Sequence, residues 1–165
     1  MKVNIRKATA RDYKALCELF NEVDALHRGR LPGIFQKPSG PVRKYDHYWG
    51  LITDENVGLF IAEVERKVIG FVQAIVIDTP NIPVLVRRYY AIIDSIGVKE
   101  DFQQHGIGQA LMDRLHEWVN EKGATSVEVN IYNFNEAAIT FYEKLGYKTL
   151  TRRMSRDLKA DEVTD

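Results

Sequence analysis

One stretch of the sequence combines residue types that could hold a phosphate group. A β-rich run at 89–98 leads into a loop with two glycines, Gly106 and Gly108, and the loop leads into a helical pattern. The first N–H groups of a helix have no partner inside the helix, and the helix dipole favours negative charge there. Glycines let the backbone approach a phosphate without an intervening Cβ atom. A P-loop would need a lysine after the second glycine and a Rossmann fingerprint a third glycine, and the sequence has neither. The pattern that remains, Gln103-x-x-Gly106-x-Gly108, is weak evidence by itself.

A second stretch places an amide and a phenol on one side of a predicted helix. Asn135, Ala138 and Tyr142 stand at positions i, i+3 and i+7, so they share one helix face. The small Ala138 would let a ligand approach, and the two polar groups could hydrogen-bond it. The structural alternative is an asparagine that caps the helix and a half-buried tyrosine.

The remaining sequence indicates the elements that position these groups. Alternating residues predict strands, and apolar residues spaced by three and four predict helices. Thr9 followed by Asp12 resembles a capping box at the start of the first helix. The predicted elements are, in order, a strand at 3–7, a helix to about residue 26, a loop at 28–45, a short helix at 43–53, strands at 58–65, 68–79 and 89–98, a helix at 108–122, a strand at 126–132, a helix at 135–145 and a strand at 147–156.

This order predicts a mixed α/β sheet in a single domain. The elements between 89 and 132 form a right-handed β-α-β crossover, which makes its two strands parallel. We assign residues 1–158 to one domain and 159–165 to a polar C-terminal tail.

Composition excludes several classes of protein. The chain has 165 residues, is 45% hydrophobic and carries 23 basic and 23 acidic residues, which argues against disorder and against a dedicated nucleic-acid binder. Its one cysteine, Cys17, cannot form an internal disulfide, and the four histidines lack metal-ligand spacing. No run reaches 18 apolar residues and the start lacks the apolar part of a signal peptide, so we expect a cytoplasmic protein with no membrane partner.

Together the two motifs strongly resemble those of the GNAT superfamily of acyl-CoA-dependent N-acyltransferases. Gln103-x-x-Gly106-x-Gly108 is similar to its pyrophosphate-binding motif, with Gln in place of the commoner Arg, and the stretch from Asn135 to Tyr147 is similar to its second motif. The resemblance spans residues 3–156. It implies an α/β fold of the α+β type, whose mixed and mostly antiparallel sheet of six to seven strands is flanked by helices and contains a β-α-β cofactor-binding unit.

The resemblance also implies residue roles. Backbone N–H groups would bind the pyrophosphate of acetyl-CoA, the end of the fourth strand would pair with the pantetheine arm, the Val98 N–H would donate to the thioester carbonyl, and Asn135 would bond the pantetheine amides. Tyr142, whose phenol has an ordinary pKa of about 10, would protonate the departing thiolate. The complete cofactor-binding set is Ile96, Gly97, Val98, Gln103, Gln104, His105, Gly106, Ile107, Gly108, Gln109, Asn135 and Tyr142.

Asp94 is the first candidate for the general base, because it precedes Val98 on the strand that approaches the thioester. The alternative role for Asp94 is structural, as a loop cap or as the partner of an arginine. Glu63 and Asp78 are further candidates for the base. Some relatives rely on positioning and water instead.

We therefore expect an N-acetyltransferase that uses acetyl-CoA and no metal. The predicted reaction is direct attack by a primary amine of a small molecule in a ternary complex. Acetylation of a protein N-terminus or lysine is the first alternative, and a non-catalytic acyl-CoA-binding module is the second. The basic loop at 28–45 could attract an anionic substrate or be merely solvated, and a homodimer is expected by analogy with relatives.

Overall fold

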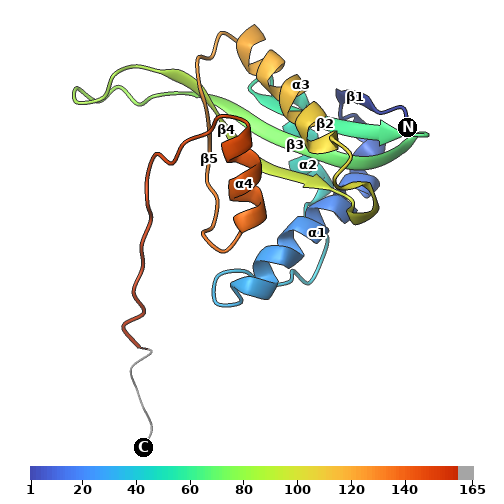
Figure 1. Cartoon of the computed structure of the whole chain (residues 1–165), viewed down its shortest axis with the longest axis horizontal. Helices are drawn as coiled ribbons and strands as arrows, with labels where there is room; N and C mark the ends of the chain where they lie inside the picture. Colours follow the sequence, from blue (N-terminus) through green and yellow to red (C-terminus); the bar gives the residue numbers. More distant parts are fainter. Residues whose placement is uncertain (160–165) are drawn as a thin grey trace, which may run out of the picture. The chain divides into compact units, whose positions relative to one another are not determined.

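A computed structural model describes residues 1–159 of the chain (Figure 1). Contacts divide it into two compact units, Met1–Asn130 and the part from Ile131 onward. The tail predicted at 159–165 lies outside the described residues except for Lys159. The single domain assigned to 1–158 stays a prediction.

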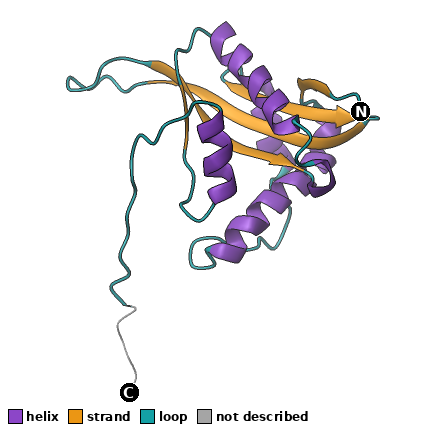
Figure 2. Ribbon diagram, in the orientation of Figure 1, coloured by secondary structure: helices purple, strands orange, loops and turns teal. Residues whose placement is uncertain are grey.

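The first unit is built on a five-stranded sheet in the order β1-β2-β3-β4-β5 (Figure 2). The first four strands pair antiparallel, and β4 pairs with β5 in parallel, which confirms the predicted mixed sheet and its parallel pair. The elements of this unit are β1 (Asn4–Lys7), α1 (Tyr13–Arg30), α2 (Tyr45–Thr53), β2 (Val57–Val64), β3 (Lys67–Asp78), β4 (Tyr89–Val98), α3 (Ile107–Glu121) and β5 (Val127–Val129), with short 3₁₀ turns at Ala10–Asp12 and Glu100–Phe102.

Helices cover both faces of this sheet. The Phe71 ring of β3 lies 4.8 Å from the Phe20 ring of α1, centroid to centroid. The preceding residue, Gly70, faces the other way: a Cβ atom there would lie 3.3 Å from a methyl group of Leu111 on α3. Successive residues of a strand point to opposite faces, so α1 and α3 lie on opposite sides.

Apolar stripes of the helices form the core, as their spacing predicted. Leu16, Leu19 and Phe20 of α1 are at most 2% exposed. On α3, Leu111, Leu115, Trp118 and Val119 are buried in the same way. Burial of each such side chain stabilises the fold by about 1.5–3 kcal/mol before entropy is counted.

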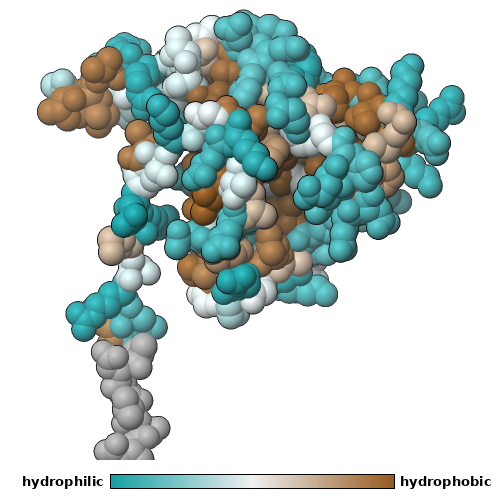
Figure 3. All heavy atoms as spheres, in the orientation of Figure 1, coloured by the Kyte–Doolittle hydropathy of each residue, from teal (hydrophilic) through white to brown (hydrophobic). Residues whose placement is uncertain are grey.

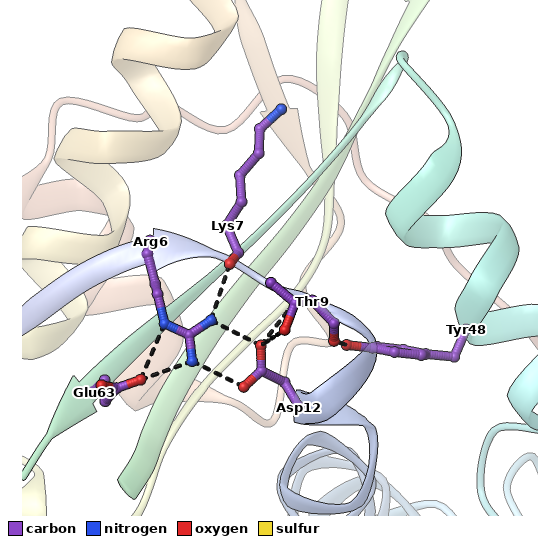
Figure 4. A network of polar contacts seen from close by, with 6 residues as sticks. All are labelled: Arg6, Lys7, Thr9, Asp12, Tyr48 and Glu63. Carbon is purple, nitrogen blue, oxygen red and sulfur yellow. Dashed lines mark hydrogen bonds and ion pairs between the residues drawn. The ribbon is translucent and has the colours of Figure 1, made fainter. Parts of the chain in front are cut away.

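An ion-pair network joins β1 to the start of α1 (Figure 4). The Arg6 guanidinium donates to both carboxylate oxygens of Asp12, at 2.8 and 2.9 Å, and to Glu63 on β2 at 2.7 Å. The Thr9 N–H donates to Asp12 at 2.7 Å, which confirms this part of the predicted capping box, and the Tyr48 hydroxyl donates to the Thr9 carbonyl. Burial raises the pKa of Asp12, but the bonds from Arg6 and Thr9 outweigh it and hold that pKa below its ordinary value.

The connection between β3 and β4 is a projecting hairpin with an apolar tip. The Thr79 N–H and the Arg88 carbonyl close it with a 2.8 Å hydrogen bond. Ile82, Val84 and Val86 are 47%, 88% and 80% exposed. These side chains gather in the brown patch at the left of Figure 3.

The second unit differs from the prediction. It contains α4 (Glu136–Lys144), but the strand predicted at 147–156 is absent, so the described residues form five strands and not six to seven. Strand β5 is also shorter than predicted. The reason is that a strand forms only where a neighbouring strand completes its hydrogen bonds. The alternation of apolar and polar residues does not specify which strand that neighbour is.

None of the helices in the described part of the chain is long and apolar enough to span a bilayer.

Candidate functional site

A β-bulge in β4 lies at the centre of the first unit's candidate site. Ser95 faces Gln73 of β3 and Ile93 faces Ala74, so Asp94 is an extra residue without a partner on β3. Such a bulge bends the strand and shifts the alternation of its backbone groups by one residue.

Before the bulge, the backbone groups of the odd-numbered residues of β4 form hydrogen bonds toward β5 and the residues that lead into it. The Ala91 N–H donates to the Ser126 carbonyl at 2.9 Å, and the Thr125 N–H donates to the Tyr89 carbonyl at 3.0 Å. The parallel pairing ends at Ile93, which faces Val129. The rest of β4 therefore has no strand on its β5 side among the described residues.

After the bulge, the even-numbered residues turn their backbone groups to that unpaired side. The Lys99 N–H donates to the Ile69 carbonyl of β3 at 2.8 Å. Residues of an antiparallel strand alternate in direction, so the N–H and C=O groups of Val98 and Ile96 point away from β3. The Gln103 side chain confirms this direction, because its amide donates to the Val98 carbonyl at 2.9 Å. Among residues 1–159, no group accepts the Val98 N–H, which therefore remains a free donor.

The loop after β4 presents a second set of free donors. Gln104 and Gly106 have left-handed backbones, with φ of 65° and 78°, and α3 begins at Ile107. Within residues 1–159, the backbone N–H groups of Gly106, Ile107, Gly108 and Gln109 donate to no protein group. The loop is exposed, and it offers these donors together with the positive end of α3.

This loop fits the pyrophosphate of a coenzyme A molecule. Adjacent N–H donors without internal partners are what an anion at a helix N-terminus requires. A side chain at Gly106 would meet no atom within 4 Å, so the positive φ, and not lack of space, calls for glycine. The His105 ring, which was expected to contact the cofactor, has its Nδ1 2.8 Å from the Gln103 carbonyl.

Tyr142 lies in α4 in the second unit, and Asn135 is the N-cap residue directly before that helix. The Asn135 Oδ1 accepts the Ala138 N–H at 3.2 Å. This oxygen therefore caps the helix, as in the structural alternative considered for Asn135. No group in the described part of the chain accepts a hydrogen bond from the Asn135 NH₂ group, which remains a possible donor. Tyr142 is only 4% exposed, with ring centroids of Phe141 and Tyr147 each 5.2 Å away. Burial, with a smaller effect of Tyr147, raises the pKa of Tyr142 above its ordinary value.

The three candidate bases differ in their partners. Asp94 is exposed, and its carboxylate makes no hydrogen bond or ion pair within the described chain, so neither structural role considered for it is found. Glu63 is bound by Arg6. Asp78 lies exposed at the end of β3 where the hairpin begins. The described residues also contain no group of three potential metal ligands.

Sequence reasoning missed two features of this site. No sequence pattern predicts the hydrogen bond from the Gln103 side chain to the Val98 carbonyl. The bond forms because the turn between the two residues brings them together in space. The bulge at Asp94 depends on how β4 is paired with β3. No residue pattern within β4 predicts it.

Comparison with known proteins gives the family to which this geometry corresponds. The sequence model of the acetyltransferase (GNAT) family matches residues 17–147. The uncharacterized N-acetyltransferase MJ1207 of Methanocaldococcus jannaschii is 36% identical over 100 residues, which are 61% of this chain and 42% of that protein. The [ribosomal protein bS18]-alanine N-acetyltransferase of Escherichia coli is 33% identical over 63 residues, which are 38% of this chain and 43% of that enzyme. These matches span less than half the length of either relative.

Solved structures share the fold. The BH1408 protein of Bacillus halodurans, as a tetramutant, has a TM-score of 0.88 at 24% identity, over 94% of this chain and 99% of that one. An aminoglycoside acetyltransferase from an uncultured soil metagenomic sample has a TM-score of 0.71 at 19% identity, over 95% and 97% of the two chains.

Proposed function

The chain belongs to the acetyltransferase (GNAT) family, and from this premise we propose that it transfers the acetyl group of acetyl-CoA to a primary amine of a small molecule. The observation that carries the proposal is the pair of free donor sets that follow the bulge. One is the Val98 N–H on the unpaired side of β4, and the other is the row of N–H groups at the start of α3.

These donors match the acyl donor's polar groups in order. The N–H groups from Gln104 to Gln109 would hold the pyrophosphate, and the N–H and C=O groups of Ile96 would pair with the pantetheine arm like an added strand. The Val98 N–H would then donate to the thioester carbonyl as negative charge develops on its oxygen, a contribution worth about 10²–10³ in rate for a single donor. Asn135 would contribute its free NH₂ group.

The proposed reaction moves two protons. The amine nitrogen attacks the thioester carbon, the C–S bond breaks, and the thiolate takes the phenolic proton of Tyr142, which solvent later restores. The amine proton passes to Asp94, directly or through water. A base is useful because an amine with a pKa of about 10.4 is roughly one part in 10³ neutral at pH 7.

Asp94→Asn tests the base. We expect kcat/KM at pH 7 to fall about 10²-fold, within the range for general-base catalysis. The deficit should shrink as pH approaches the pKa of the acceptor amine, because the neutral amine then needs no base. Initial rates of thiol release from acetyl-CoA between pH 6 and 10 measure both effects. Glu55→Gln, at an exposed turn residue, is the control, and an unchanged rate for Asp94→Asn at pH 7 would exclude Asp94.

Gly106→Val tests whether the loop before α3 binds the pyrophosphate of acetyl-CoA. A β-branched residue at a φ of 78° is strained, so the loop should shift and the KM for acetyl-CoA should rise at least tenfold. Gly123→Val is a matched control, because Gly123 has a φ of 80° and open space around it but lies at the other end of α3. Both variants should lose similar thermal stability. Equal KM values for acetyl-CoA in the two would contradict the assignment.

The acceptor is tested with a panel of amines and peptides in the thiol-release assay. We expect small amines to be turned over faster than peptides with a free N-terminal alanine or an internal lysine. The opposite order would favour protein acetylation, the activity named for the bS18-alanine relative that matches 38% of this chain. Binding of acetyl-CoA without thiol release on any acceptor would favour a non-catalytic module.

A further inference from the structure

Helix α1 covers only part of one face of β3 and β4. The Phe71 ring of β3 packs against Phe20 of α1 on this face. Gly97 of β4 pairs with Phe71, and a Cβ atom at Gly97 would lie 2.9 Å from a methyl group of Val23. The helix therefore lies over this pair of residues, and β3 and β4 continue past it toward the projecting hairpin (Figure 2).

Beyond α1 the same face carries four apolar side chains. Alternate residues of a strand share a face, and so do residues directly opposite each other on paired strands. The residues placed there by the register of β3 and β4, which we call the strand patch, are Ile75, Ile77, Tyr90 and Ile92. Ile75 is 38% exposed, and the other three are half-buried.

The composition of the strand patch is unusual for a sheet face that meets solvent. Antiparallel strands with one solvated face normally alternate inward apolar residues with outward polar ones. In β3 the buried Ala74 and Val76 form the inward set, but isoleucines occupy the outward positions on either side of Val76. An exposed apolar patch with a polar rim is typical of a binding site.

Polar groups border the strand patch along β4. At one end lies the bulge with Asp94, roughly 7 Å from Ile92 and roughly 13 Å from Tyr90 along the strand. Glu128 of β5 faces Ile92 and accepts a 2.9 Å hydrogen bond from Arg88. The Arg88 guanidinium carbon in turn lies 4.3 Å from the centroid of the Tyr90 ring. An apolar surface therefore runs from the carboxylate of the bulge to a charged pair.

We propose that the strand patch binds the body of the acceptor, which is therefore a primary amine with an apolar aryl or alkyl body and not an amino sugar or a polyamine. This inference rests on the proposed function, because it takes Asp94 as the group beside the reacting nitrogen. With the nitrogen at Asp94, a body roughly 7 Å long would lie over Ile75 and Ile92. The patch is continuous with Asp94, and the carboxylates on its border match the charge of a protonated amine. These two features favour the acceptor as the occupant over a second protein chain.

Acceptor preference is the first test. The probe is 2-phenylethylamine, because its ring and two-carbon linker give an apolar body of this length. In the thiol-release assay with acetyl-CoA, we expect its kcat/KM to exceed the values for glucosamine and spermidine by about tenfold or more. If glucosamine or spermidine reacts faster, transfer to a small amine stands and the inference about the strand patch is wrong.

The double variant Ile75→Thr/Ile92→Thr tests the strand patch itself. Threonine keeps the β-branched shape that suits a strand but exchanges apolar surface for a hydroxyl group. We expect the KM for 2-phenylethylamine to rise about tenfold and the KM for acetyl-CoA to change little. The matched control is Val84→Thr/Val86→Thr, which makes the same kind of change at exposed residues of the hairpin tip and should keep both KM values.

Melting curves check that each variant is folded. The single variant Ile75→Thr, at the most exposed member of the strand patch, replaces the double variant if the latter is unfolded, and its KM for 2-phenylethylamine should rise about threefold. A folded variant of the patch with the wild-type KM for this amine contradicts the inference.

Binding is also measured without catalysis, by saturation-transfer NMR of 2-phenylethylamine in the presence of coenzyme A. We expect a signal from the wild type and from the hairpin control, and a much weaker one from the strand-patch variant. If the wild type binds the amine but releases no thiol, the proposed transfer fails while the strand patch stands as a site for apolar amines. If the wild type does not bind the amine, the patch has another occupant and the inference is overturned.

Discussion

Tyr142→Phe should lower kcat by about 10²-fold or more while the KM for acetyl-CoA changes little. The variant removes one hydroxyl group and keeps the ring that packs against Phe141 and Tyr147. A thiolate that leaves without a proton donor is a poorer leaving group, whereas binding of the nucleotide end of acetyl-CoA uses other atoms. The loss should therefore fall on the chemical step.

The pH profile adds a second expectation for Tyr142. Burial raises the pKa of this phenol above its ordinary value, so the proton that it donates is still present well above neutral pH. The wild-type rate should rise with pH as the acceptor amine is deprotonated, with no loss of the donor below about pH 10.

Single-turnover kinetics provide the decisive measurement, because they report the chemical step even if product release limits kcat. Tyr147→Phe is the matched control: it removes a hydroxyl whose pKa is raised to about 12 by burial, from a ring that contacts Tyr142. We expect this control to retain its rate. A Tyr142→Phe protein with a wild-type single-turnover rate would show that another group protonates the thiolate.

Asp12→Ala should lower the free energy of unfolding by about 2–3 kcal/mol at pH 7. Breaking a buried ion pair costs about 3–5 kcal/mol, and the smaller value reflects the partial exposure of Arg6, whose side chain is 33% accessible. The loss also removes the acceptor of the Thr9 N–H, so the start of α1 loses its tie to β1.

The same carboxylate makes the stability of the protein depend on pH. The pKa of Asp12 is lower in the folded chain than in the unfolded one, so its contribution is complete above about pH 4 and is lost as pH falls through the folded value. Urea unfolding at pH 7 and pH 3 should therefore show a smaller difference between wild type and Asp12→Ala at the lower pH. Glu18→Ala, which removes an exposed pair with Lys99 at 3.8 Å, should cost less than about 1 kcal/mol at either pH. If Asp12→Ala and Glu18→Ala lowered the free energy of unfolding equally, burial of Asp12 would make no additional contribution to stability.

The location of the free donors gives the first glycine motif a structural meaning. Glycine at position 106 is needed for a left-handed turn, and the free N–H groups follow from the start of α3 directly after it. Gln103, which replaces the commoner arginine, is tied to the Val98 carbonyl and so links the loop to the end of β4. Loop and strand end are thereby held as one piece of the candidate site.

Contiguous residues determined much of this protein without any help from its tertiary structure. The apolar periodicity of α1 and α3, the alternation in β2 to β4, the glycine turn before α3 and the family motifs are local patterns, because helices and turns form between residues a few positions apart. The tertiary structure alone decided the bulge at Asp94, the direction of the Val98 N–H and the Arg6 network. Each of these depends on which distant strand lies alongside and in which register, and a strand's own sequence specifies a side-chain alternation but not the neighbour that completes its hydrogen bonds.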